Sequence, residues 1–205
     1  MPDIIPALSQ RRARRAYDPR PLLPDEEHAL WYAVSVAPSH GNTQPTRILV
    51  ARSPEKREAL VAALSDGNRH WAQAAPLLAA LTAQPAHDTV QKNRDGSERE
   101  MWTFHAGIAA GNLMTQATAM GIIAHPLAGF DEQSVRDVFG APEELRVLAV
   151  FAIGRPGPVE SLPEDLQRKE VAPQVRLPLE RIVAEDRWHN GLAEPARDLS
   201  RRDRG

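Results

Sequence analysis

Short apolar runs separated by helix-forming segments limit most strongly how this chain folds. Four such runs stand at residues 47–51, 75–83, 121–130 and 145–154, and they read RILVA, APLLAALTA, GIIAHPLAGF and LRVLAVFAIG. Their lengths and the turn residues around them are typical of strands. For the second run, which is apolar on both faces, periodicity alone leaves a buried helix fragment open.

Helix signals lie between these runs, so helices and strands alternate. Pro24 and the acidic residues after it begin a helix in PDEEHALWYAVSVA. In SPEKREALVAALSDG, Ser53 is the expected N-cap and Gly67 the expected stop, and DEQSVRDVFG is a further capped helix. The longest helical segment runs from Glu100 to Met120, and its small residues favour a central place, in the core or against a second subunit.

The segments outside these elements are polar or rich in proline. Residues 3–13 predict a short helix that ends in basic residues, and residues 84–99, with the turn signal Asp95–Gly96, predict a mobile surface loop. From Arg155 onward the chain is charged and Pro-rich, with one apolar island, VRLPLERIV. Such a tail cannot form its own core, so we expect it to wrap around the body or a partner.

Composition narrows the class of protein. The 205 residues carry a net charge of -2 and include 42% hydrophobic residues, which fits a soluble globular chain and disfavours nucleic acid or an acidic membrane as partner. Because there is no cysteine, thiolate chemistry and disulfides are excluded. No apolar run approaches the roughly 20 residues of a membrane helix. We expect a cytoplasmic protein with one domain over residues 1–188 and a disordered tail over residues 189–205.

Four arginines stand close together near the start of the chain: Arg11, Arg12, Arg14 and Arg15. One interpretation is a solvated basic face or a helix C-terminus that favours cations. The other is an anion clamp, because guanidinium groups form paired hydrogen bonds with phosphate oxygens. Arg176, in the tail, is either an ordinary exposed arginine or the group that closes the clamp.

The run APSHGNTQP offers six consecutive positions, residues 39–44, that hydrogen-bond through a side chain or a bare backbone. A plain turn needs one or two such residues, so we interpret the run as the wall of a site for a flat polar ligand. His40 has no carboxylate or second histidine at ligand spacing, so it is a pocket-lining residue rather than a metal ligand. In AHPLAGF, Pro126 and Gly129 shape either a plain turn or a loop whose backbone N–H groups can approach a ligand.

The order of these motifs, RRARRAYD, APSHGNTQP, GIIAHPLAGFD, FAIGRP and VRLPLERIV, resembles the nitroreductase family of FMN-dependent oxidoreductases. The resemblance covers nearly the whole chain up to Trp188. It implies an α+β sandwich with a central, mostly antiparallel sheet flanked by helices. It also implies an intertwined homodimer, FMN at the dimer interface, and NADH or NADPH as electron donor.

The resemblance assigns the cofactor-binding residues in three groups. The residues at the phosphate, the ribityl chain and the pyrimidine edge would be Arg11, Arg12, Ala13, Arg15 and Arg176. The residues that line the flavin from the partner subunit would be Pro38, Ser39, His40 and Asn42. The residues beside the reactive N5 edge would be Leu127, Ala128 and Gly129. Arg15 would stabilise negative charge on the reduced flavin, and no protein acid or base is strictly needed.

The implied activity is a ping-pong cycle that passes hydride from NAD(P)H through flavin N5 to a small electron-poor acceptor, such as a nitroaromatic, a quinone or an activated alkene. Residues 84–99, Trp102 and Phe104 are candidates for the lid and walls of the acceptor pocket, with a plain surface loop and core aromatics as the alternative. Two other functions stay open. One is a relative that consumes reduced flavin with oxygen, or a dehalogenase; the other is a flavin-binding or regulatory module without turnover.

Overall fold

An antiparallel four-stranded sheet organises the first part of the chain. The computed structural model describes residues 4–196; the residues up to Glu170 form one compact unit, and those from Val171 form another. The sheet has the order β1-β2-β6-β5. Its strands are β1 (Thr46–Ala51), β2 (Leu77–Ala83), β5 (Ile123–Leu127) and β6 (Arg146–Gly154). All three neighbouring pairs are antiparallel, which confirms the predicted α+β fold and its mostly antiparallel sheet.

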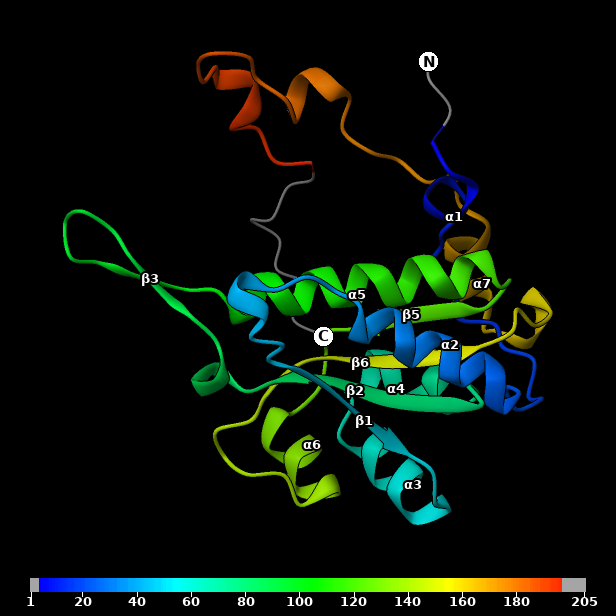
Figure 1. The fold of residues 1–205 in the computed structure, drawn as a ribbon. Helices are drawn as coiled ribbons and strands as arrows, with labels where there is room; N and C mark the ends of the chain where they lie inside the picture. The colour runs from blue at the N-terminus through cyan, green and yellow to red at the C-terminus, as the bar shows by residue number, and fades with distance from the viewer. Residues whose placement is uncertain (1–3, 197–205) are drawn as a thin grey trace. The chain divides into compact units, whose positions relative to one another are not determined.

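Helices cover both faces of this sheet (Figure 1). The helices are α1 (Pro6–Ser9), α2 (Pro24–Ser35), α3 (Pro54–Ala62), α4 (Asp66–Ala72), α5 (Trp102–Ala119), α6 (Glu132–Phe139) and α7 (Glu164–Val171). Leu81 and Phe151 belong to a buried core with α2 and α5, whereas Leu78 and Val150 belong to a buried core with α3, α4 and α6. Alternate side chains of a strand point to opposite faces, so the sheet is the middle layer of a sandwich.

The register gives the sheet two distinct ends. At one end Thr46 of β1 pairs with Ala83 of β2. At the other end Leu77 of β2 pairs with Ile153 of β6, next to the last residue of that strand, Gly154. Because β2 spans seven residues, the two ends are about 20 Å apart. Segments that meet the sheet at opposite ends are therefore well separated within one chain.

The longest predicted helix is confirmed as α5. Small buried residues, among them Ala106, Ala109 and Ala117, face the core, while Phe104 is 60% exposed. Among residues 4–196, none of the helices combines the length and the apolar character that crossing a membrane requires.

Capping residues lie where the sequence predicts them in two helices, α3 and α6. Ser53 Oγ accepts a hydrogen bond from the Lys56 main-chain N–H at 3.3 Å, and the Asp131 carboxylate caps α6 by accepting from the Ser134 N–H at 2.7 Å. Gly140 ends α6 with a φ of 63°, a left-handed conformation that favours glycine.

We expect Ser53→Ala to lower the free energy of unfolding by about 1 kcal/mol, because the first turn of α3 loses its side-chain acceptor. Urea unfolding monitored by circular dichroism measures the change. Ser53→Thr keeps the hydroxyl and should behave like the unmodified protein; if both variants lose the same free energy, the capping bond is not the cause.

The expected stop at Gly67 is wrong. α3 ends at Ala62, and Gly67 lies inside the separate helix α4. Between the two helices Leu64 forms an isolated bridge with Phe130, which takes the backbone out of the helical path, and Ser65 begins the new helix. This break brings the start of α4 beside the loop that follows β5.

The predicted surface loop at residues 84–99 contains regular structure, because residues 90–100 form an exposed hairpin, and its mobility stays a prediction. β3 (Val90–Lys92) pairs with β4 (Glu98–Glu100), and the predicted turn at Asp95–Gly96 joins them. Lys92 and Glu98 form an ion pair at 3.6 Å across the strands. The hairpin projects away from the sheet (Figure 1).

The Pro-rich end of the chain contains regular structure that the sequence analysis did not predict. α7 belongs to the first unit up to Glu170, and its Leu166 and Glu170 are buried. The second unit contains the short 3-10 helices η4 (Leu179–Arg181) and η5 (Asn190–Leu192). The remaining 3-10 helices are η1 (His40–Asn42), η2 (Pro85–His87) and η3 (Val159–Ser161). Residues 197–205 of the predicted disordered tail lie outside the described residues, and the wrapping of the tail stays a prediction.

Candidate functional site

The arginine-rich segment is extended. α1 ends at Ser9, so the arginines follow the helix, and the expectation of a helix over residues 3–13 is wrong in its extent. On a helix these like charges would crowd one end, whereas an extended chain places neighbours on alternate sides. Next to the arginines, Tyr17 bridges to Pro156, and the Gly157 N–H donates to the Ala16 carbonyl at 2.9 Å. The segment is therefore fixed at the end of β6.

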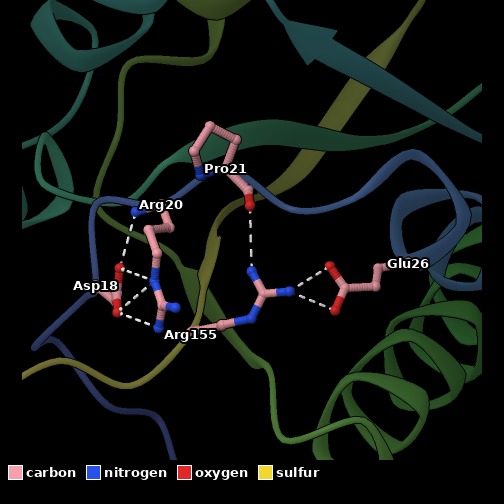
Figure 2. A network of polar contacts seen from close by, with 5 residues as sticks. All are labelled: Asp18, Arg20, Pro21, Glu26 and Arg155. Atoms are coloured by element: carbon pink, nitrogen blue, oxygen red, sulfur yellow. Dashed lines mark hydrogen bonds and ion pairs between the residues drawn. The ribbon is translucent and has the colours of Figure 1, made fainter.

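A polar network fixes the chain between the arginines and α2 (Figure 2). Arg20 pairs with Asp18 at 2.7 Å, and hydrogen bonds from Arg20 lower the pKa of Asp18 to about 2. Arg155 donates to the Pro21 carbonyl at 3.2 Å and to both carboxylate oxygens of Glu26 at 2.5 and 2.6 Å. The arginine segment therefore has a second fixed point, at the start of α2.

The arginines face two different surroundings. Arg12 and Arg14 line a cavity of about 170 Å³ between the end of α5 and the start of β5. Arg11 and Arg15 lie close enough to His125 for their charges to act on its ring. Nη1 of Arg12 is buried and has no hydrogen-bond partner among residues 4–196. A buried guanidinium N–H of this kind fits an oxyanion, the group with which arginine forms its strongest hydrogen bonds.

Arg15 is held by an aromatic ring and a carboxylate. Its guanidinium carbon lies 5.6 Å from the centre of the Trp71 ring. Its main-chain N–H donates to the two carboxylate oxygens of Glu170 at 2.9 and 3.0 Å. Trp71 stacks on Tyr17 and lies 4.7 Å from the His125 ring. Burial raises the pKa of Tyr17 well above its usual value, and the charge of Glu170 raises it further.

His125 is a buried histidine on β5 that stays neutral at ordinary pH. Its Nδ1–H donates to the Arg14 carbonyl at 2.9 Å, which leaves the lone pair on Nε2. Burial lowers the pKa of His125 to about 4, helped by the positive charges of Arg15 and Arg11 and opposed by the hydrogen bond to Arg14. A neutral acceptor nitrogen therefore lies beside the two arginines.

We expect His125 to destabilise the cofactor-free protein in mild acid. Its folded pKa of about 4 lies below the ordinary value of 6.5, so the unfolded chain binds a proton first as the pH falls. Stability is lost between these two pH values, and the fall from about pH 7 to about pH 5 should lower the free energy of unfolding by about 2 kcal/mol. Urea unfolding at both pH values measures it. His125→Gln should lose this share of the pH dependence, and an equal pH effect in both proteins would refute the assignment.

The loop after β5 rests on α4 through Gly129. The Gly129 carbonyl accepts from the Ser65 N–H at 2.9 Å and from the Asn68 side chain at 3.2 Å. A Cβ atom at Gly129 would lie 2.4 Å from Ser65 Oγ and 2.8 Å from Asn68 Nδ2, so glycine is required here. Leu127 is buried and Ala128 is exposed. The backbone of residues 128 and 129 is therefore the part that can face a ligand.

The polar run uses many of its hydrogen bonds to shape its own loop. Ser39 Oγ accepts from the Gln44 N–H at 2.9 Å, and the Gln44 side chain donates to Asn42 at 2.9 Å. Asn42 and Gln44 have positive φ angles of 57° and 49°, which cost free energy in residues other than glycine. Pro38 and Ser39 line a cavity of about 290 Å³, while His40 and Asn42 are exposed. The loop is thus rigidly shaped with an open outer face.

Two buried side chains anchor this loop to the rest of the molecule. His105 on α5 accepts the His40 main-chain N–H at Nε2 (3.1 Å), and its Nδ1 lies 2.6 Å from Asp88 Oδ2. The Thr43 hydroxyl donates to Asp88 Oδ1 at 2.7 Å. Burial raises the pKa of Asp88, but the hydrogen bonds from Thr43, His105 and Thr89 outweigh it and the pKa is lowered. The base of the hairpin is therefore tied to the polar loop.

Of the two aromatic residues considered for the acceptor pocket, only Phe104 is accessible. Trp102 is buried, and its Nε1–H donates to Glu100 at 2.7 Å. The guanidinium carbon of Arg146 lies 5.6 Å from the Trp102 ring. Trp102 is therefore a core aromatic, as the alternative interpretation has it.

The predicted cofactor residues lie in two separate groups. The arginine segment and the loop at 127–129 meet through α4, whose Trp71 contacts Arg15 and whose Asn68 contacts Gly129. The loop from Pro38 to Asn42 lies at the opposite end of the sheet, because it leads directly into β1. Arg176 belongs to the unit from Val171, where its Nη1 donates to the Val175 carbonyl at 2.7 Å.

Several residues that the structure places in the site were assigned no role in it from the sequence. They are Ser65, Asn68, Trp71, Asp88, His105, His125 and Glu170. Of these, His105 and His125 were interpreted as core or surface histidines rather than metal ligands. The polar run SDGNRHW carried a usable signal, since a serine followed by Asp and Asn suits a helix start, but Gly67 was interpreted as a helix stop. No sequence signal pointed to Glu170, because its hydrogen-bond partners are the main-chain N–H groups of Arg15 and Ala16, which lie 155 and 154 residues away in the chain.

Comparison with known proteins places this chain and its fold in one family. Residues 8–80 and 62–155 match the sequence profile of the Nitroreductase family. A protein of Streptomyces coelicolor, provisionally named NADH dehydrogenase/NAD(P)H nitroreductase, is 32% identical over 163 residues, 73% of this chain and 83% of that protein. The chain therefore belongs to the nitroreductase family.

Two further relatives extend the match over most of the chain. An NADH dehydrogenase of Thermus thermophilus is 29% identical over an alignment of 207 residues, gaps included. The alignment covers 88% of this chain and 95% of that protein. A crystal structure described as an oxidoreductase containing FMN superposes with a TM-score of 0.80 at 28% identity, over 91% of this chain and 93% of that one.

Proposed function

We propose that this protein is an FMN-dependent NAD(P)H oxidoreductase that reduces small electron-poor acceptors, such as nitroaromatics, quinones or activated alkenes, in a ping-pong cycle. Family membership and relatives named for NADH, NAD(P)H and FMN support it. FMN would supply the redox chemistry, by taking hydride at N5 from the nicotinamide and passing it to the acceptor. The observation that carries the proposal is the junction of the arginine segment, Trp71 and the Gly129 loop through α4.

The side chains at this junction fit FMN. The buried, unpaired Nη1 of Arg12 offers a phosphate a charge-assisted hydrogen bond, and the adjacent Arg11 adds positive charge on the side of His125. Ala128 is exposed, so its main chain would meet the edge of a flat ring, while the Gly129 carbonyl is held by Ser65 and Asn68. Ala13 is exposed and makes room beside the arginines, and Arg176 is the proposed last ligand of the phosphate.

Arg15 would bind and orient the pyrimidine edge of the flavin. Its main chain is fixed by Glu170 and its guanidinium lies over Trp71, so its charge is held in place before the cofactor arrives. A preorganised positive charge stabilises negative charge that develops on reduction. No acid or base residue of the chain is required for this role.

We propose that the functional unit is a homodimer in which the partner supplies Pro38, Ser39, His40 and Asn42. In one chain these residues meet the sheet about 20 Å from the arginine segment, at the other end of β2, so a second copy is the simplest way to complete one site. Exposed apolar side chains on α5 and on and just after α2 support the same proposal, and they include Tyr32, Val36 and Phe104. Sedimentation equilibrium tests it.

The test of the proposed function is the visible absorption spectrum of the purified protein without oxygen, before and after NADH and then NADPH. A flavin band that bleaches with either donor is the expected result. A colourless protein that gains no band with added FMN would refute the proposal. A flavin band that neither donor bleaches would favour a flavin-binding module, and bleaching that is reversed only by oxygen would favour a relative that consumes reduced flavin with oxygen.

A further inference from the structure

We infer that Glu170 sets the reduction potential of the flavin by opposing the charge of Arg15. The inference rests on the proposed function, because it concerns a cofactor at Arg15. Glu170 lies in the last turn of α7, and its side chain is 1% exposed. Unpaired carboxylates are almost never buried to this extent, so its partners need an explanation.

The partners of Glu170 all belong to the arginine segment. Its two carboxylate oxygens accept the Arg15 main-chain N–H at 2.9 and 3.0 Å, and Oε1 also accepts the Ala16 N–H at 3.4 Å. Oε2 lies 3.8 Å from Nη1 of Arg15. That distance makes an ion pair but not a good hydrogen bond. The guanidinium therefore stays available to a ligand while the carboxylate lies beside it.

The two charges act on a ligand in opposite directions. The positive charge of Arg15 stabilises a reduced, negatively charged flavin, and a buried negative charge beside it weakens that effect. Tyr17 stacks on Trp71 in the same cluster, and its raised pKa keeps it uncharged. His125, also against Trp71, is neutral because its pKa is about 4. Among the groups of this cluster, Glu170 thus supplies the negative charge that offsets the positive charge of Arg15. The positive charge of Arg11 acts on the cluster from the side of His125.

The consequence is a more strongly reducing cofactor. If Arg15 acted without Glu170, reduced flavin would bind more tightly than it does, and it would pass electrons to an acceptor less readily. Glu170 is a positioning residue in this scheme, since it acts through Arg15 and through the main chain that carries it. A merely structural carboxylate would affect folding and cofactor affinity but not the potential.

The test is the midpoint potential of the FMN-loaded protein, measured by equilibration with a reference dye. Glu170→Gln keeps the size and one acceptor oxygen but removes the charge. We expect it to favour binding of reduced over oxidised FMN about tenfold, which raises the potential by about 30 mV for a two-electron couple. Arg15→Gln should shift it in the opposite direction. Glu164→Gln, on the same helix with a side chain 85% exposed, is the matched control and should leave the potential unchanged.

An unchanged potential in flavin-loaded Glu170→Gln would overturn the inference and leave the proposed function standing. If that variant does not fold, Glu170→Asp decides, because it keeps the charge and draws it back from Arg15. It should raise the potential by a smaller amount, and an unchanged potential there overturns the inference as well. If the unmodified protein binds no FMN, the proposed function itself fails, and the two failures are distinguished.

Discussion

Replacing Arg12 by alanine should weaken FMN binding about 100-fold and leave riboflavin binding nearly unchanged. The guanidinium of Arg12 has a buried, unpartnered Nη1, which we propose as a donor to the phosphate. A charge-assisted hydrogen bond contributes about 1.5–3 kcal/mol, and about 1.4 kcal/mol corresponds to a factor of ten in affinity. Riboflavin lacks the phosphate, so it cannot lose this contact. Titration of cofactor-free protein with each flavin, followed by fluorescence quenching, measures both dissociation constants.

The control for this experiment is Arg20→Ala. Arg20 stands in the same segment, but its side chain is 74% exposed and paired with Asp18. We expect FMN affinity to change less than about threefold, because exposed ion pairs contribute little. If Arg12→Ala weakens FMN and riboflavin equally, then Arg12 supports the segment rather than the phosphate.

Replacing Gly129 by alanine should lower kcat/KM of the FMN-loaded protein about 100-fold. The added Cβ would lie 2.4 Å from Ser65 Oγ and 2.8 Å from Asn68 Nδ2, so the loop or these side chains must shift, and we expect the loop to be displaced. A displacement of about 1 Å in a segment that positions a reacting group costs about this factor. Overpacking of this kind also lowers the free energy of unfolding, by about 1–3 kcal/mol. Steady-state kinetics and urea unfolding measure the two effects.

Two variants separate the overlap at Gly129 from a general effect of adding a methyl group. Gly107→Ala places a Cβ on the exposed side of α5, where nothing in the same chain lies within 4 Å, and it should leave the free energy of unfolding equal or slightly higher. Gly129→Ala combined with Ser65→Gly removes the nearest obstructing atoms and should recover part of the activity. If the double variant is no better than Gly129→Ala, the contact with Ser65 does not explain the loss.

The fold could be predicted largely from local patterns. Residues 77–83 are buried on both faces because β2 lies inside the sheet with helices on each side, so their unbroken apolar run was informative. Ser53, Asp131 and Gly140 act as caps because capping depends on near neighbours. The break between α3 and α4 was only partly predictable: Ser65 is a local helix-start signal, but the bridge from Leu64 to Phe130, which takes the backbone out of α3, is far away in sequence.

The candidate site was harder to predict, because its partners are distant in the chain. The arginines and Gly129 were found through motifs, but Glu170 and Trp71 contribute through contacts with Arg15 that leave no local signal. The polar run was interpreted as a ligand wall, yet Ser39 and Gln44 bond to each other. The sequence shows that these side chains can form hydrogen bonds. It does not show the positive φ angles of Asn42 and Gln44, which set the directions in which the loop points its side chains.

The proposed homodimer would tie cofactor occupancy to protein concentration, because the two groups of predicted cofactor residues meet the sheet at opposite ends. In the proposed homodimer, a single chain holds two half-sites that never meet, so a binding site exists only while two chains are joined. FMN binding and chain association are then one linked equilibrium, in which each favours the other. Dilution would release flavin and separate the subunits together, and abundant flavin would keep the dimer assembled in cells where the protein is scarce.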